Sequence, residues 1–225
     1  MRDTATVRAL VTGGTGRVGS AIATGLREEG HEVVAAGRAD GDLRAAAAAR
    51  QLVEGAAEQL GGLDLVVHAA GEGFVPKPVE EVTEDDWDAA LGATAKGSFF
   101  VAQAAAPHLR RSRGTIVLIE DVAGYRPWPS FAPHCAAKAA QAMLTRVLAR
   151  ALAPEVRVCG VAPGPVAVQP EQLERRAAET ALGRVGEPAD VAEAVLFLAG
   201  ADFVTGATLA VDGGLLLQTG RPTVA

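Results

Sequence analysis

The sequence lacks several features that would indicate other classes of protein. Its only two cysteines, Cys135 and Cys159, have the spacing of neither a zinc site nor a redox motif, so we expect reduced structural thiols and no metal. With 21 Lys and Arg against 27 Asp and Glu, the net charge is -6 and no basic block occurs, which argues against a nucleic-acid partner. No apolar run approaches a membrane span, and the residues after Met1 are polar. These absences predict a cytoplasmic protein whose partners are neither nucleic acid nor a membrane.

What is present is organised around residues 7–23. The run Val7–Val11 has strand composition and breaks into a glycine cluster, Gly13-Gly14-Thr15-Gly16-Arg17-Val18-Gly19, after which apolar residues recur at helical spacing. Glycines let the backbone turn sharply and let a phosphate approach closely, and the free N–H groups at a helix start favour an anion. Such turns also occur with no ligand. We nevertheless predict that this turn binds a dinucleotide pyrophosphate.

Strands and helices alternate along the rest of the chain. We expect strands over His31–Ala36, Leu63–His68, Gly114–Ile119, Val156–Val161 and Thr208–Val211, and helices over Leu43–Leu60, from Thr83 to about Leu109, from Pro133 to about Ala153 and from Glu187-Pro188 to about Leu198. This alternation predicts one α/β domain over residues 1–225, with a Rossmann-type doubly wound parallel sheet. The fold is shortened between its second and fourth strands, where Asp42-Leu43 is either the remnant of a third strand or a helix cap.

The end of the second expected strand bears on which dinucleotide binds. Enzymes that use NAD normally place an acid there for the ribose hydroxyls, but here no acid occurs before Asp40. Arg38, with Arg17 in the glycine cluster, would instead favour a 2′-phosphate, because a guanidinium pairs with phosphate in a bidentate fork. The alternative is that both are solvated surface arginines. We predict NADP(H) as the cofactor.

The chain resembles the short-chain dehydrogenase/reductase family along nearly its whole length. The matching motifs are residues 12–19, His68-Ala69-Ala70-Gly71 at the position of the family's Asn-Asn-Ala-Gly, the helix around Lys138, Pro163-Gly164-Pro165-Val166, residues 182–188, and residues 204–206 with 211–214. The resemblance implies a nicotinamide cofactor, a homodimer or homotetramer formed through the long helices, and a substrate lid at about residues 166–181. It implies cofactor contacts from Gly13, Thr15, Gly16, Arg17, Val18, Gly19, Arg38, Asp42, Leu43, Ala70, Gly71, Lys138, Pro163, Gly164 and Val166.

The catalytic positions depart from the family pattern. The family has a Tyr four residues before the Lys, a Ser thirteen before the Tyr, and an Asn upstream, whereas here Lys138 is accompanied by His134, Asp121 and Thr94. Asp for Ser, Arg17 for the second loop glycine, and the segment from Phe74 to Pro78 resemble the pteridine reductase branch, although Phe74 alone could be an ordinary loop aromatic. We therefore predict substrate contacts from Arg17, Phe74, Asp121, Trp128 and His134, and a pterin, dihydropterin or small carbonyl substrate.

The altered site could still support reduction. In the family the Tyr supplies a proton while the Lys lowers its pKa and binds the nicotinamide ribose. We predict an NADPH-dependent reductase with catalytic residues Asp121, His134 and Lys138, in which the first two relay the proton. A helix N-terminus and a nearby Lys disfavour the imidazolium, whereas a neighbouring carboxylate favours it. The alternative is a catalytically impaired NADP-binding protein, and Tyr125 is a less favoured substitute proton donor.

Overall fold

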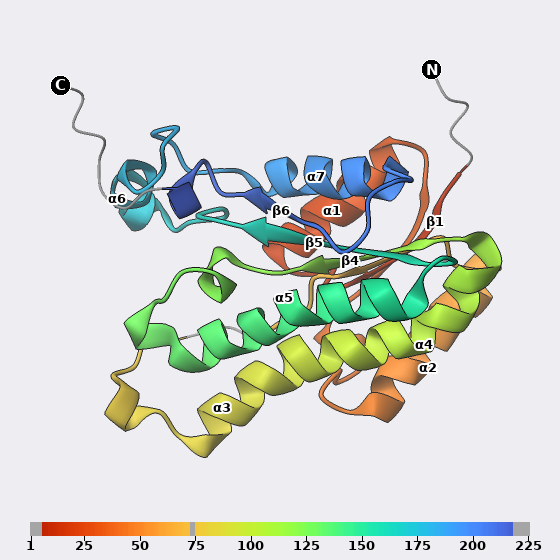
Figure 1. Ribbon diagram of the computed structural model, residues 1–225, viewed down its shortest axis with the longest axis horizontal. Coiled ribbons are helices and arrows are strands. Elements are labelled where there is room, and N and C mark those ends of the chain that lie inside the picture. Colours follow the sequence, from red (N-terminus) through yellow and green to blue (C-terminus); the bar gives the residue numbers. More distant parts are fainter. Residues whose placement is uncertain (1–5, 73–74, 218–225) are drawn as a thin grey trace.

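The computed structural model, which describes residues 6–72 and 75–217, has one sheet of six parallel strands in the order β2-β1-β3-β4-β5-β6 (Figure 1). The strands are β1 (Arg8–Thr12), β2 (Glu32–Ala36), β3 (Leu65–His68), β4 (Thr115–Ile119), β5 (Arg157–Pro163) and β6 (Thr208–Val211). The α-helices are α1 (Arg17–Glu28), α2 (Ala46–Leu60), α3 (Glu84–Leu91), α4 (Gly97–Ser112), α5 (Ala132–Leu152), α6 (Leu173–Ala178) and α7 (Pro188–Gly200). The predicted single-domain doubly wound α/β fold is confirmed.

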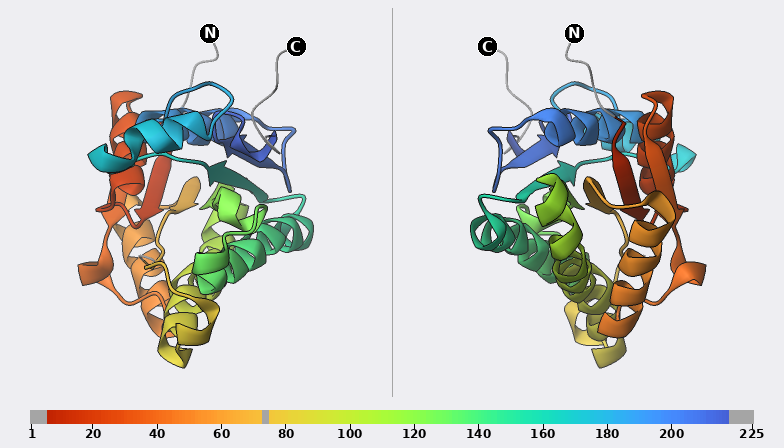
Figure 2. Two further views of the ribbon diagram at one scale, coloured as in Figure 1. Left: turned by 90° about the vertical axis from the view of Figure 1, so that its left-hand side faces the viewer. Right: turned by 90° about the vertical axis from the view of Figure 1, so that its right-hand side faces the viewer.

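Helices cover both faces of the sheet (Figure 2). On one face α1 packs beside α7, and on the other α2 packs beside α4 and α4 beside α5. Successive strand residues enter opposite cores: Val66 lies in the core with α2 and α4, and Val67 in the core with α1 and α7. Burial on both faces explains why the strands read as continuous apolar runs. Within the described residues, none of the helices has both the length and the apolar character needed to cross a membrane.

The chain between β2 and β3 is shortened, as predicted, but neither reading of Asp42-Leu43 was right. Residues 37–64 contain no strand, so β2 is an edge of the sheet. The Asp42 carboxylate accepts hydrogen bonds from the backbone N–H of Arg44 (3.0 Å) and from its guanidinium, which makes a local turn. The N-cap of α2 is Ala45, so the helix begins at Ala46 rather than Leu43. The exposed edge is partly protected, because Arg27 donates to the β2 carbonyl of Val33 at 3.1 Å.

The helix predicted from Thr83 to Leu109 is interrupted. Thr83 and Asp86 form a reciprocal capping box at the start of α3, where the sequence predicted the start of a helix. A π-helical turn then occupies Gly92–Lys96 before α4 begins, and it buries Thr94. Such turns insert a residue into a helix and often occur at functional sites. The other predicted strands and helices match the observed ones closely.

Candidate active site

Two glycines allow the loop after β1 to pack tightly. Gly13 has φ +69°, and a Cβ there would lie 2.6 Å from backbone atoms of Ala69 and Ala70. A Cβ on Gly19 would lie 2.1 Å from the Gly13 carbonyl oxygen, so any other residue would push α1 away from the loop. The N-cap of α1, Gly16, makes no side-chain capping bond, and the first turn carries no acid. The free N–H groups at this helix start are therefore available to an anion.

A cavity of about 280 Å³ opens beside this loop, at the carboxyl ends of β1, β2 and β3. Ligands bind at this edge in open parallel sheets. Eight of the predicted cofactor residues line it: Gly13, Thr15, Gly16, Arg38, Asp42, Leu43, Ala70 and Gly71. Arg44, Glu72 and Ala93 also line it, although no sequence motif indicates these three residues.

The other predicted cofactor residues lie outside this cavity. The Arg17 guanidinium donates to the carbonyl of Ala167, so it ties the glycine loop to the segment after β5. Val18 and Gly19 belong to the first turn of α1. Pro163 ends β5, Gly164 donates its N–H to the carbonyl of Val211 at 2.9 Å, and Val166 bridges to Gly186. Lys138 lies on α5 beside the catalytic candidates.

Two arginine–carboxylate pairs stand in the cavity wall. Arg38 Nη2 lies 3.0 and 2.9 Å from the two Glu72 oxygens. Arg44 grips Asp42 through both Nε (2.9 Å) and Nη2 (2.7 Å), which lowers the pKa of Asp42 to about 2. Positive charge is thus present at the end of β2, but Arg38 has a carboxylate partner that the sequence pattern does not indicate.

The three predicted catalytic residues lie close together. Asp121 directly follows Glu120 at the end of β4, and His134 and Lys138 are one turn apart on α5. His134 Nε2 lies 3.3 Å from Asp121 Oδ2, while Asp121 Oδ1 accepts the N–H of Ala123 at 2.7 Å and is held in place. His134 and Lys138 are both buried. The arrangement can orient an imidazole and hold a proton on it.

Lys138 is anchored by neutral partners rather than by Asp121. Its Nζ donates to the carbonyl of Ile119 (2.8 Å) and to Gln141 Oε1 (3.0 Å). Gln141 in turn donates to Ser98 Oγ at 2.8 Å, and Ser98 donates to the carbonyl of Thr94 in the π turn. Burial lowers the pKa of Lys138, although the nearby carboxylates oppose this. Gln141 and Ser98 were not predicted as site residues. The feature that could have indicated them is a polar residue at a helix position that the periodicity places in the core.

A buried carboxylate, Glu120, lies next to the partly buried Asp121 in the chain. It accepts hydrogen bonds from the hydroxyls of Tyr125 (2.5 Å), Thr145 (2.6 Å) and Thr208 (3.2 Å). Burial, together with the bond to Glu120, raises the pKa of Tyr125 to about 12. The Tyr125 hydroxyl is therefore committed to Glu120, which argues against it as a substitute proton donor.

Another cavity, of about 360 Å³, lies beside His134, between α3, the segment 75–82 and the start of α5. Its lining includes His134, Thr94, Lys77 and Glu72, so Glu72 lines both cavities. Trp128 does not line it: its ring packs on Phe131 (5.9 Å between centroids) and lies under the Arg176 guanidinium of α6. Phe74 is outside the described residues. Among the residues that are described, no group of three or more acidic, His or Cys side chains is placed to hold a metal ion.

Comparison with known proteins agrees with the fold. The family described as Enoyl-(Acyl carrier protein) reductase matches residues 26–216. The chain is 36% identical over 242 residues to 4-formylbenzenesulfonate dehydrogenase of Comamonas testosteroni, covering 92% of this chain and 96% of that protein. It is 35% identical over 243 residues to 2-(S)-hydroxypropyl-CoM dehydrogenase 3 of Xanthobacter autotrophicus, covering 91% and 94%.

The structural comparison gives the same result. The short-chain dehydrogenase/reductase from Serratia marcescens superposes with a TM-score of 0.84 at 31% identity, covering 92% of this chain and 97% of that chain. The family match over residues 26–216 includes the strands β2 to β6 and the helix α5, which carries Lys138. The chain therefore belongs to the short-chain dehydrogenase/reductase family of oxidoreductases.

Proposed function

We propose that this protein is an NADPH-dependent reductase of a pterin, a dihydropterin or a small carbonyl compound. The observation that carries the proposal is the contact between His134 and Asp121, one helical turn from the buried Lys138. These residues lie at the carboxyl edge of the sheet, as does the cavity beside the glycine loop. The family uses a nicotinamide cofactor, which supplies the hydride. A reductase also needs a proton donor near the cofactor, and His134 lies at this edge of the sheet.

The residues around the glycine loop fit such a cofactor. The backbone at Gly13 leaves no room for a side chain, and the start of α1 offers N–H groups to a pyrophosphate. Arg38 would hold the 2′-phosphate of NADPH, and Lys138 would hold the nicotinamide ribose. The predicted contacts from Val18, Gly19, Pro163, Gly164 and Val166 belong to the same proposal.

The chain's own residues would handle the proton. When bound, NADPH supplies a hydride to an electrophilic carbon of the substrate. His134 would deliver the matching proton to the adjacent oxygen or nitrogen. Asp121, fixed by the N–H of Ala123, would orient the imidazole and stabilise its protonated form. The positive charge of Lys138, one helical turn away, opposes that form.

Different observations support the two substrate classes. Arg17 in the glycine loop and Asp121 at the Ser position support the pteridine reductase-like branch and a pterin. Two relatives are instead named for compounds that carry a formyl group and a secondary alcohol. Their names support a carbonyl substrate for this protein. An assay therefore has to include both classes.

Residues 166–181 are proposed as the substrate lid. The Arg17 guanidinium holds Ala167 at the start of this segment, and the Arg176 guanidinium lies 5.6 Å from the centre of the Trp128 ring near its other end. A substrate wall that includes Trp128 would thus be joined to the lid by a cation–π contact. Phe74 keeps its predicted place in that wall as a proposal.

The first test is turnover. We expect the wild type to bind NADPH, measured by fluorescence, and to oxidise it with dihydrobiopterin or with a member of a carbonyl panel that includes 4-formylbenzenesulfonate. His134→Ala should lower kcat by roughly 100-fold or more, because proton donors typically contribute that much. His108→Ala is a matched control, since His108 also faces a carboxylate, Glu54, at 3.1 Å but lies on α4 away from the site.

The outcomes separate the two readings of the altered site. Tight NADPH binding without turnover on any substrate would favour the catalytically impaired protein. Restoring the family residue with His134→Tyr should raise reduction if the rest of the site is intact. If that variant binds NADPH and stays inactive, the change at position 134 is not the sole obstacle.

A further inference from the structure

We propose that Glu72 sets the preference between NADPH and NADH by competing with the cofactor's 2′-phosphate for Arg38. The inference rests on the proposed function, because it takes Arg38 as the phosphate ligand. Glu72 comes directly after the His68-Ala69-Ala70-Gly71 motif, and Arg38 begins the turn after β2. Both side chains line the cavity beside the glycine loop.

The geometry of the pair indicates that it can be displaced. Both contacts to Glu72 use the single nitrogen Nη2 of Arg38, at 3.0 and 2.9 Å. Bidentate pairs, in which two guanidinium nitrogens meet two carboxylate oxygens, are the stronger arrangement. The Arg38 side chain is also 73% exposed, and water weakens ion pairs at such positions.

The neighbouring arginine shows the contrast. Arg44 donates hydrogen bonds from both Nε and Nη2 to the Asp42 carboxylate, and Asp42 also accepts a hydrogen bond from the backbone N–H of Arg44. Arg44 is thereby held in a local turn two residues from its partner. Arg38 instead reaches Glu72 across the cavity, 34 residues away in the sequence. Of the two guanidinium groups in this wall, Arg38 is the one that a ligand can take over.

Charge decides which partner Arg38 keeps. A phosphate monoester carries a charge of roughly -1.5 to -2 near neutral pH and offers three acceptor oxygens, whereas Glu72 offers one negative charge. NADPH would therefore pull Arg38 away from Glu72 and lose part of its binding free energy in doing so. NADH has no such phosphate and leaves the pair intact. Removing the carboxylate should then strengthen NADPH binding alone.

The test compares dissociation constants of NADPH and NADH, measured by fluorescence on the full chain, for Glu72→Gln, Arg38→Ala and the double variant. We expect Glu72→Gln to tighten NADPH binding roughly two- to five-fold, the range for an exposed ion pair, and to leave NADH unchanged. In the Arg38→Ala background the same substitution should have no effect on NADPH. Glu80→Gln, an exposed acid in the same loop, makes the same charge change and should alter neither constant.

The result also distinguishes the inference from the function beneath it. If Arg38→Ala weakens NADPH and NADH equally, the phosphate assignment of the proposed function is wrong. If Arg38→Ala weakens NADPH selectively but Glu72→Gln leaves NADPH unchanged or shifts both cofactors alike, the phosphate assignment stands and competition by Glu72 is overturned. The double variant ensures that a general effect of Glu72→Gln on folding is not mistaken for competition.

Discussion

Among single residues, His68 is a buried polar group whose hydrogen bonds are incomplete, which is costly in a core. It is fully buried at the end of β3, with Nδ1 3.0 Å from Thr12 Oγ1, while Nε2 has no hydrogen-bond partner of normal geometry in the described residues. Burial lowers the pKa of His68 to about 3, and the charge of Lys138 acts in the same direction. The backbone of Ala93 acts in the opposite direction without forming a well-aligned bond. The native state therefore holds a neutral imidazole.

This predicts a specific dependence of stability on pH. A free His titrates near 6.5, so between about pH 6.5 and pH 3 the unfolded chain binds a proton that the native state excludes. The stability linked to His68 is thus complete above pH 6.5 and is lost as the pH falls toward 3. From pH 7.5 to pH 5 this group should cost the wild type about 2 kcal/mol in the free energy of unfolding.

Urea unfolding of His68→Asn at the two pH values tests this prediction. Asn is neutral, so the variant should lose less stability between pH 7.5 and pH 5 than the wild type, whatever its stability at either pH. His31→Asn is the control, because His31 is only partly buried and its Nδ1 accepts the N–H of Val7. An unchanged pH dependence in His68→Asn would refute a neutral buried imidazole.

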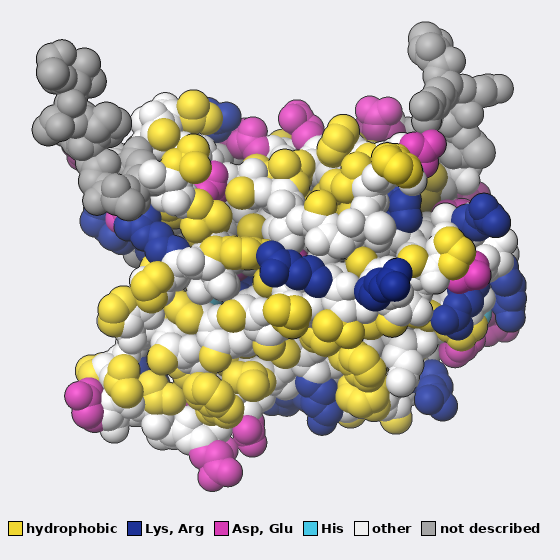
Figure 3. Space-filling model, viewed as in Figure 1, with side chains coloured by type: hydrophobic (Ala, Val, Ile, Leu, Met, Phe, Trp, Pro, Cys, Tyr) yellow, Lys and Arg dark blue, Asp and Glu magenta, His cyan; other side chains and the backbone are white. Residues whose placement is uncertain are grey.

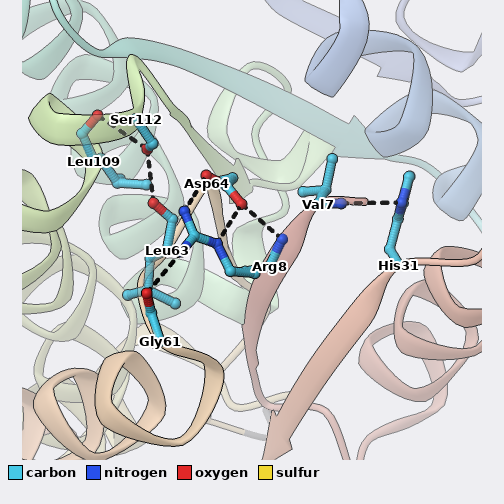
Figure 4. Close-up of polar contacts among 8 residues, drawn as sticks. All are labelled: Val7, Arg8, His31, Gly61, Leu63, Asp64, Leu109 and Ser112. Atoms are coloured by element: carbon cyan, nitrogen blue, oxygen red, sulfur yellow. Dashed lines mark hydrogen bonds and ion pairs between the residues drawn. The ribbon is translucent and has the colours of Figure 1, made fainter. Parts of the chain in front are cut away.

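At the scale of elements, arginines hold the amino edge of the sheet. Arg8 in β1 donates to Asp64 from Nε and Nη2, both at 2.8 Å, and Nη1 donates at 2.7 Å to the carbonyl of Gly61, the C-cap of α2 (Figure 4). Arg157 similarly donates to the carbonyls of Leu198 and Ala199 in the last turn of α7. Cations at helix C-termini satisfy carbonyls that lack intrahelical partners. Each strand is thereby tied to the helix beside it.

Arg8→Ala should therefore reduce the free energy of unfolding by roughly 2 kcal/mol at pH 7, the range for hydrogen bonds to charged groups in a partly buried pair. Arg44→Ala is the matched control, since its bidentate pair with Asp42 is about half exposed and should contribute much less to the free energy of unfolding. Urea unfolding of the two variants decides the matter. Equal small losses would mean that the Arg8 pair does no more than a surface ion pair.

The elements that the sequence predicted well are those with local signals. Continuous apolar runs predicted the strands, and Thr83, a residue type preferred at helix N-termini, marks the predicted start of α3. No local sequence pattern indicates the π turn at Gly92–Lys96. It lies beside contacts between distant segments, because Gly97, directly after the turn, packs closely against Leu43 and His68. The predicted start of α2 at Leu43 was also wrong. The apolar spacing there is that of a helix, but the side-chain contact between Asp42 and Arg44 makes a turn instead.

The candidate site divides in the same way. Gly13, Asp121, His134 and Lys138 stand at motif positions, so the sequence alone could select them. Glu72 could not be selected, because its partner Arg38 comes beside it only when the ends of β2 and β3 lie on either side of β1. Contacts between distant segments are what a pattern along one chain cannot supply.

The whole molecule separates its stabilising contacts from its candidate site. Both cavities beside the predicted site residues lie at the carboxyl edge of the sheet, and the Arg8 and Arg157 contacts lie at the amino edge. The face that carries α4 and α5 differs from both edges of the sheet, because it exposes large hydrophobic side chains. Figure 3 shows hydrophobic side chains gathered across it, and Phe99, Met143 and Val147 are 37%, 55% and 51% exposed. Apolar surface of this kind commonly marks a protein–protein interface.

We propose that a second copy of the chain covers this face in a homodimer or homotetramer. Met143 and Val147 lie four residues apart on α5 and so share one side of the helix. Met143→Glu would bury an unpaired charge in that interface, at a cost that should dissociate it. Light scattering after size exclusion should give a dimer or tetramer for the wild type and a smaller species for this variant. Leu182→Glu, 68% exposed in the segment after α6, should keep the wild-type mass. A monomeric wild type, or a Met143→Glu variant that keeps its full mass, would show that this face is not the interface.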